Sequence, residues 1–145
     1  MKIAIGCDPN AEAFKQQLIP YIESLGHTVE DFGSDDVIYA NAAIRVGEAV
    51  AAKQFDRGIL ICGTGIGISI AANKVKGAYC ALVTDVYQAQ RAQLSNNANL
   101  IAMGSQVLGI ELAKCLAKEY LSNTFDPASR SLPKVARITA YEEGC

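Results

Sequence analysis

A cysteine followed by three alternating glycines is the part of this sequence best suited to chemistry. Cys62 ends an apolar run that begins at Gly58, and Gly63, Gly65 and Gly67 follow it before another apolar segment. A strand, a glycine-rich loop and a helix in that order point several backbone N–H groups, and the positive end of a helix dipole, at one spot. We therefore expect a negatively charged group to bind at this loop, next to a thiol.

The Cys62 thiol has an inert and a reactive interpretation. Buried free cysteines commonly behave as small hydrophobic residues, and we favour that interpretation for Cys7, Cys80 and Cys115. Cys62 differs from them because it leads directly into the glycine loop, where N–H groups favour the thiolate form. A reactive role is therefore the better interpretation for this one cysteine.

The glycine loop does not fit the common nucleotide-binding motifs. The dinucleotide pattern Gly-x-Gly-x-x-Gly would need a glycine at Ile68, and the loop follows the third expected strand rather than the first. The Gly-Lys-Ser/Thr ending of a P-loop is also absent. A small oxyanion or an enediolate fits this loop better.

Other polar residues stand where they could join such a site. Asp8 follows the first expected strand, and capping the next helix and facing a ligand are equally good interpretations. Arg130, Lys134 and Arg137 near the C-terminus form either a solvated face or a phosphate clamp, for which arginine's planar fork is suited. Asn96 belongs to a polar cluster just before the fifth expected strand.

Short apolar runs alternate with segments of helical spacing along the chain. We expect strands at 2–7, 28–32, 57–62, 78–83 and 100–103, and helices at 11–25, 42–53, 65–75, 85–94, 110–121 and 132–141. Pro20 predicts a kink or break in the first helix, and Gly26 predicts its end. The alternation predicts an α/β fold, a Rossmann-like three-layer sandwich with a five-stranded parallel sheet and helices on both faces. Ligands of such sheets bind beyond the carboxyl ends of the strands, where Asp8 and Cys62 stand.

Length and composition predict a single domain spanning 1–145. Half of the residues are hydrophobic and 19% are charged, which is apolar for a small monomer and favours a buried subunit interface. The net charge of −2 argues against nucleic acid or an anionic membrane as the main partner. No segment approaches the ~20 apolar residues of a membrane span, and the first residues lack the pattern of a signal peptide. We expect a cytoplasmic protein.

The chain contains few side chains of the kinds that bind metals or form catalytic triads. His27 is the only histidine, and the five cysteines are widely spaced without a Cys-x-x-Cys pair. We therefore expect no metal site, no disulfide framework and no Ser-His-Asp triad. His27 stands at a helix–strand junction and is best interpreted as structural.

Long blocks of the chain resemble the ribose-5-phosphate isomerase B and galactose-6-phosphate isomerase subunit family. The blocks are KIAIGCD at 2–8, GHTVEDFG at 26–33, the run 56–74 around the glycine loop, NNANLIAMGS at 96–105 and GIELA at 109–113. Members interconvert aldose and ketose phosphates through a cis-enediolate, without a metal or organic cofactor. The resemblance implies that this chain is such an isomerase, acting on a small phosphorylated sugar.

The resemblance also implies a role for each residue of the loop. Cys62 would be the base that moves a proton between C1 and C2, and Thr64 would assist at the sugar oxygens. The backbone of Gly63, Gly65, Ile66 and Gly67 would hold the enediolate oxygens. This agrees with the interpretation from the residues alone, a thiolate beside a preorganised oxyanion site.

The remaining roles involve two copies of the chain. By resemblance, Asp8 and Tyr39 would bind substrate hydroxyls. Asn96, Arg130, Lys134 and Arg137 would bind the phosphate end, and would do so in the neighbouring subunit's site. The resemblance therefore implies a homodimer or a dimer of dimers with shared sites, and the tail 127–145 is expected to pack on the partner subunit.

The chain departs from the family where histidines are usual. Pro9 and Ser95 stand at positions where the family usually has histidine, and Gln106 stands where the family often has a phosphate-binding arginine. The C-terminal pattern Gly-Gly-Arg-His-x-x-Arg is replaced by ASRSLPK at 128–134. The histidine expected at Ser95 is the one assigned to opening the furanose ring. The resemblance thus implies that proton transfer is kept and assisted ring opening is lost.

Four explanations of these departures stay open. The substrate could be a tetrulose 4-phosphate, whose C4 oxygen is blocked by phosphate and cannot close a furanose ring. The chain could instead pair with a histidine-bearing homologue, as in heteromeric galactose-6-phosphate isomerases. It could be a non-catalytic phosphosugar-binding relative. Finally, it could be an ordinary ribose/ribulose 5-phosphate isomerase with a substitute acid–base group.

Overall fold

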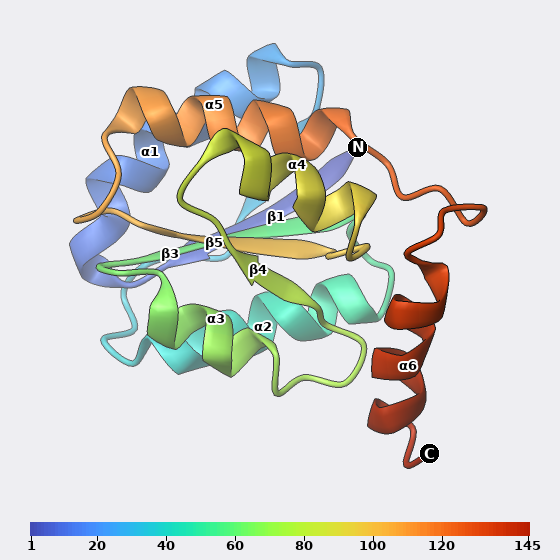
Figure 1. The fold of residues 1–145 in the computed structure, drawn as a ribbon. Coiled ribbons are helices and arrows are strands. Elements are labelled where there is room, and N and C mark those ends of the chain that lie inside the picture. Colours follow the sequence, from blue (N-terminus) through green and yellow to red (C-terminus); the bar gives the residue numbers. More distant parts are fainter.

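Five parallel strands form the middle layer of the structure (Figure 1). The computed structural model describes all residues, 1–145. The strands are β1 (Lys2–Cys7), β2 (Thr28–Asp31), β3 (Arg57–Cys62), β4 (Cys80–Leu82) and β5 (Leu100–Gly104), in the spatial order β2-β1-β3-β5-β4. The predicted five-stranded parallel sheet is confirmed. The two central strands β3 and β5 are buried at every residue, as expected for strands covered on both faces, whereas β2 and β4 at the edges are partly exposed.

Helices cover both faces of the sheet, as predicted (Figure 1). They are α1 (Glu12–Ser24), α2 (Tyr39–Ala51), α3 (Ile66–Ala72), α4 (Val86–Leu94), α5 (Ile110–Ser122) and α6 (Leu132–Glu142), with a short 3-10 turn η1 (Pro9–Ala11) before α1. Helices α1, α4 and α5 form one core with the sheet, and α2 and α3 form a second core on the opposite face. None of these helices has the length and apolar character needed to cross a lipid bilayer.

Strand β4 is shorter than the expected 78–83, and three helices also differ from the expected ones. Helix α1 runs without a break through Pro20, which is exposed, so of the predicted kink or break the break is wrong. Helix α2 begins at Tyr39 rather than at residue 42, which brings this tyrosine into the first turn. Helix α3 is the shortest and ends at Ala72, because a turn at Asn73 follows instead of a further helical turn. The predicted stop of α1 at Gly26 is confirmed by its left-handed φ of 97°.

A buried lysine fastens α1 to the edge strand β2. The Nζ atom of Lys15 lies 2.6 Å from Oδ1 of Asp31 and 3.2 Å from Oε2 of Glu12. Partial burial opposes ionisation of Asp31, but hydrogen bonds from Lys15 and from the Gly33 N–H outweigh it and hold the pKa of this carboxyl below its ordinary value. The pair fixes the start of α1, and with it the turn that follows β1.

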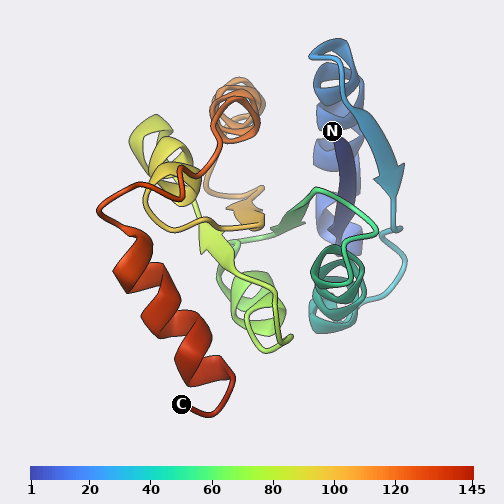
Figure 2. The ribbon, with the colours of Figure 1, turned by 90° about the vertical axis from the view of Figure 1, so that its right-hand side faces the viewer.

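The C-terminal helix α6 stands outside the three layers (Figure 2). None of its residues is buried, although Leu132, Ile138 and Tyr141 are large apolar side chains. It lies at the end of the sheet opposite to the β3–α3 connection (Figure 1). This single chain therefore leaves α6 almost fully open to contact with another molecule.

Candidate active site

The candidate site lies at the carboxyl edge of the sheet, where β1 and β3 end side by side. Cys7 pairs with Ile61 in the sheet register, so Asp8 follows directly beside Cys62, and the Asp8 N–H donates to the Ile61 carbonyl at 3.4 Å. The side chains of Asp8 and Cys62 are 8% and 4% exposed. A carboxylate and a thiol thus share one small region, as the rule for parallel sheets predicts.

One backbone N–H points at the sulfur of Cys62. The Gly65 N–H donates to Sγ at 3.1 Å, within the distance allowed for a bond to sulfur. A hydrogen bond of this kind stabilises negative charge on the acceptor. The loop therefore presents an N–H donor to the Cys62 sulfur.

Further N–H groups of the loop have no acceptor within the chain. The Ile66 N–H donates to Oγ1 of Thr64 at 3.2 Å, which leaves the Thr64 hydroxyl hydrogen free to donate. The N–H groups of Gly63, Thr64 and Gly67 make no hydrogen bond to the protein. Because α3 has only seven residues, these individual donors, rather than a long helix dipole, are the groups available to an anion here.

The loop is held in place by close contact with β5. Gly65 has a left-handed φ of 78°, and a Cβ there would lie 2.6 Å from Cδ1 of Leu82. The Ser105 N–H donates to the Cys62 carbonyl and the Gln106 N–H donates to the Gly63 carbonyl, both at 2.9 Å. These contacts fix the donors before any ligand arrives.

Tyr39 lies across the other end of the loop. A side chain at Gly67 would overlap the phenol of Tyr39, so the ring covers the start of α3. Asp36 secures this arrangement, because its Oδ1 accepts from the Ile38 N–H at 2.8 Å and its Oδ2 accepts from the Asn41 side chain at 2.9 Å. The structure therefore places Asp8, Tyr39, Cys62 and the loop around one region.

The other cysteines differ from Cys62 in their surroundings. Burial raises the pKa of the Cys7 thiol to about 12, and burial does the same for Cys80. Both thiols stay protonated at neutral pH, in agreement with the inert interpretation. Cys115 and Cys145 are exposed on helix α5 and at the C-terminus, away from the loop.

Four predicted site residues lie elsewhere. Asn96 follows α4 and precedes β5, so it stands at the amino edge of the sheet, and Arg130, Lys134 and Arg137 lie on or before α6 near that same edge. The three cationic residues are exposed. Within one chain these four residues and Cys62 are therefore at opposite ends of the sheet, and the structure does not bring them together.

The structure adds one residue to which the sequence had assigned no role. The carboxamide of Gln106 packs against Gly63, since a Cβ at that glycine would lie 3.3 Å from Oε1 of Gln106. Its position two residues beyond Gly104, at the carboxyl end of β5, is the sequence signal that could have placed it here.

The only histidine lies at the amino edge of the sheet, next to the N-terminus. His27 precedes the edge strand β2, and its Nδ1 is 3.0 Å from the N-terminal amine of Met1. Partial burial and the nearby N-terminal charge lower the pKa of His27. His27 therefore lies at the opposite edge of the sheet from the Cys62 of its own chain.

A parallel α/β sheet with a thiol, a carboxylate and free N–H donors at its carboxyl edge is suited to binding a small oxygen-rich anion. A family model described as ribose/galactose isomerase matches residues 3–138. The chain therefore belongs to the ribose/galactose isomerase family and is a sugar-phosphate isomerase.

Known relatives cover the chain almost completely. It is 46% identical to D-erythrulose-4-phosphate isomerase 2 of Mycolicibacterium smegmatis, over 98% of this chain and 97% of that protein. It is 42% identical to D-erythrulose-4-phosphate isomerase of Pectobacterium atrosepticum, over 98% and 95%. The structure of type B ribose 5-phosphate isomerase from Trypanosoma cruzi superposes with a TM-score of 0.95 at 35% identity, covering 100% of both chains.

Proposed function

We propose that this chain interconverts a tetrulose 4-phosphate and the corresponding aldose 4-phosphate, with Cys62 as the base. The observation that carries the proposal is the position of the only histidine, which is bound to Met1 at the amino edge. A substrate that needs no ring opening suits a site without imidazole. The names of the two relatives at 46% and 42% identity, both erythrulose-4-phosphate isomerases, support this substrate class.

The chemistry of a four-carbon substrate explains why histidine is dispensable. Closing a furanose ring on an aldotetrose requires a free hydroxyl at C4, and in a 4-phosphate that oxygen is esterified. The substrate is therefore open-chain, and its carbonyl is available without an acid–base step. A pentose 5-phosphate has a free C4 hydroxyl and closes the ring.

In the proposed reaction, one proton is removed from C1 and one is returned to C2. The Cys62 thiolate removes a proton from C1 of the ketose, and the electron pair forms the C1–C2 double bond while negative charge develops on the C2 oxygen. The N–H groups of Gly63, Thr64 and Gly67 donate to the enediolate oxygens. The same thiol then returns the proton to C2, and proton exchange between the two oxygens, assisted by the Thr64 hydroxyl, gives the aldose.

The remaining contacts divide the substrate between two subunits. Asp8 and Tyr39 bind hydroxyls beside Cys62. Asn96, Arg130, Lys134 and Arg137 bind the phosphate in the partner's site, because they lie at the opposite edge from their own Cys62. Large apolar side chains are exposed on α3, β4 and α4 around the open sheet edge, as expected of a surface that a second copy covers: Ile66, Ile70, Leu82, Val86 and Tyr87.

Mixing two impaired variants, assayed at substrate concentrations well below the KM of Arg137→Ala, tests the shared site. Cys62→Ala and Arg137→Ala chains, unfolded together and refolded, are expected to recover about one quarter of the wild-type activity, because half of the dimers are mixed and each holds one intact site. Each variant refolded alone provides the control. If the mixture stays as inactive as its components, the tail acts on its own chain or on no site.

Turnover of three ketose phosphates tests the substrate class. Erythrulose 4-phosphate is expected to give a higher kcat/KM than ribulose 5-phosphate or tagatose 6-phosphate, measured with the purified chain at equal enzyme concentration. A preference for ribulose 5-phosphate would instead support the activity named for the Trypanosoma cruzi relative. Inactivity on all three, relieved by a histidine-bearing homologue, would support the heteromer.

A further inference from the structure

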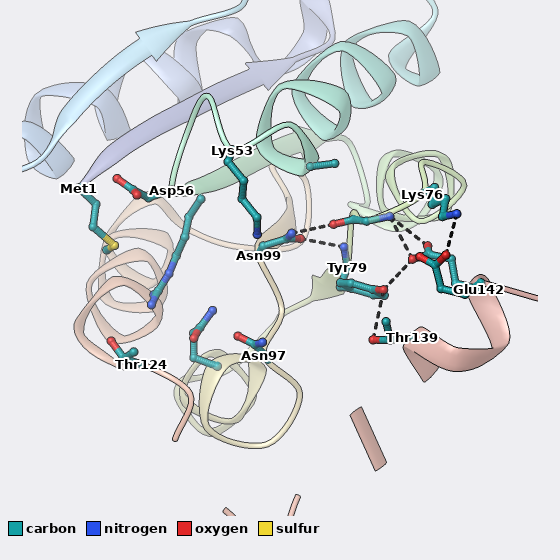
Figure 3. A pocket seen from close by; sticks show the side chains of 15 residues that line it. Met1, Lys53, Asp56, Lys76, Tyr79, Asn97, Asn99, Thr124, Thr139 and Glu142 are labelled. Atoms are coloured by element: carbon teal, nitrogen blue, oxygen red, sulfur yellow. Dashed lines mark hydrogen bonds and ion pairs between the residues drawn. The ribbon is translucent and has the colours of Figure 1, made fainter. Parts of the chain in front are cut away.

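A hydrogen-bonded network joins the start of β5 to the C-terminal helix at the amino edge of the sheet (Figure 3). Asn99, the residue just before β5, donates from Nδ2 to the Gly77 carbonyl and accepts at Oδ1 from the Tyr79 N–H, both at 2.8 Å. The turn that precedes β4 is thereby fixed to β5. This turn borders a pocket of about 610 Å³ whose far wall is α6.

The same turn holds α6 mainly through the Glu142 carboxylate, with a longer contact of 3.4 Å between the hydroxyls of Tyr79 and Thr139. Both oxygens of Glu142 accept from the Gly77 N–H at 3.1 Å, and Oε2 also accepts from the Tyr79 hydroxyl at 2.6 Å. Partial burial and the Glu142 carboxylate raise the pKa of Tyr79, so the phenol remains a donor at neutral pH. Since α6 buries no side chain of its own, these bonds are its principal attachment to the body of the chain.

We infer that Asn99, Gly77, Tyr79 and Glu142 form a clamp that sets the position of the tail cations relative to Asn96. Asn96 precedes Asn99 by three residues, and Arg137 precedes Glu142 by five residues on the same helix. The clamp thus connects the two pieces that this chain donates to its partner's site, and it acts as a positioning device for phosphate binding. This inference rests on the shared site proposed above.

The clamp determines substrate affinity through the fraction of molecules in which Asn96 and Arg137 are both in position to bind the phosphate. If α6 is loose, a phosphate meets Asn96 without Arg137, and the apparent affinity falls in proportion to the population of the docked tail. The phosphate is remote from C1 and C2. Loss of the protein's contacts to the phosphate therefore raises KM more than it lowers kcat.

Removing one hydroxyl tests the clamp. Tyr79→Phe is expected to raise KM for the sugar phosphate about tenfold, the scale of one lost hydrogen bond to a charged group, with kcat changing far less. Trypsin is expected to cleave after Arg130, Lys134 and Arg137 faster than in the wild type, since the tail is released more often. Glu142→Gln is expected to shift both readouts in the same direction.

Lys76→Ala is the matched control for this experiment. Lys76 reaches the same end of α6 through an ion pair with Glu143 at 3.0 Å, but both side chains are more than half exposed. Exposed pairs of this kind contribute little. KM and the rate of trypsin cleavage are therefore expected to stay at wild-type values in this variant.

Arg137→Ala, assayed beside these variants, separates the clamp from the proposed function. If Arg137→Ala raises KM and Tyr79→Phe changes neither KM nor cleavage, the clamp is overturned while the shared site stands. If Tyr79→Phe speeds cleavage but neither variant changes KM, the tail binds no substrate. The phosphate assignment and the positioning role then fail together.

Discussion

Replacement of Cys62 by alanine is expected to lower kcat/KM for the sugar phosphate by about 10²–10⁴-fold, the usual contribution of a general base. The Gly65 N–H donates to this thiol, and Cys62 is the residue proposed above to take the proton from C1. Exchange of the C1 proton in deuterated water should be lost to the same extent. Binding of the sugar phosphate, measured by calorimetry, should remain because the loop donors are unchanged.

Cys7→Ala supplies the matched control for that experiment. Cys7 ends β1 beside Ile61 of β3, so the variant removes a thiol from the same edge of the sheet. The Cys7 side chain, however, belongs to the core on the opposite face from Cys62. The variant is expected to lose some stability, since a buried atom is removed, and to keep its kcat/KM. Equal activity of Cys62→Ala and wild type on every ketose phosphate would contradict the proposed role of Cys62.

Local pattern was enough to predict the central part of the fold. The continuous apolar runs of β3 and β5 can only be satisfied by burial on both faces, and a cysteine followed by glycines must turn immediately after such a strand. The juxtaposition of Asp8 and Cys62 followed from one rule, that ligands bind at the carboxyl ends of parallel strands. The rule places both residues at one edge of the sheet, and the pairing of β1 with β3 makes them neighbours.

Features that depend on distant contacts could not be predicted in this way. The end of α3 at Ala72 reflects the Asn73 side chain, which bonds both the N–H and the carbonyl of Cys80 in the next strand. The attachment of α6 depends on Glu142 meeting Gly77 across 65 residues of sequence. The contact between Gln106 and Gly63 likewise joins two loops that only the sheet order brings together.

Gly104→Ala is expected to lower kcat/KM by about 10²-fold, although Gly104 bears no functional group. It ends β5 opposite Cys62, and a Cβ there would lie 2.6 Å from both the carbonyl carbon and the oxygen of Thr64. These are backbone atoms, so no side-chain rotation can relieve the overlap. The loop must move away from β5, which withdraws the Gly65 N–H from Sγ and misplaces the donors for the enediolate, a loss comparable to removing one oxyanion donor.

Gly109→Ala distinguishes this explanation from a general intolerance of alanine beyond β5. Gly109 precedes α5 with an ordinary φ of −72°, and a Cβ there would meet nothing within 4 Å. The kcat/KM and the midpoint of thermal unfolding of Gly109→Ala are expected to match those of the wild type. Gly104→Ala should also lose about 1–3 kcal/mol of stability from overpacking, yet remain folded by circular dichroism. Full activity in folded Gly104→Ala would show that catalysis does not depend on the exact seating of the loop against β5.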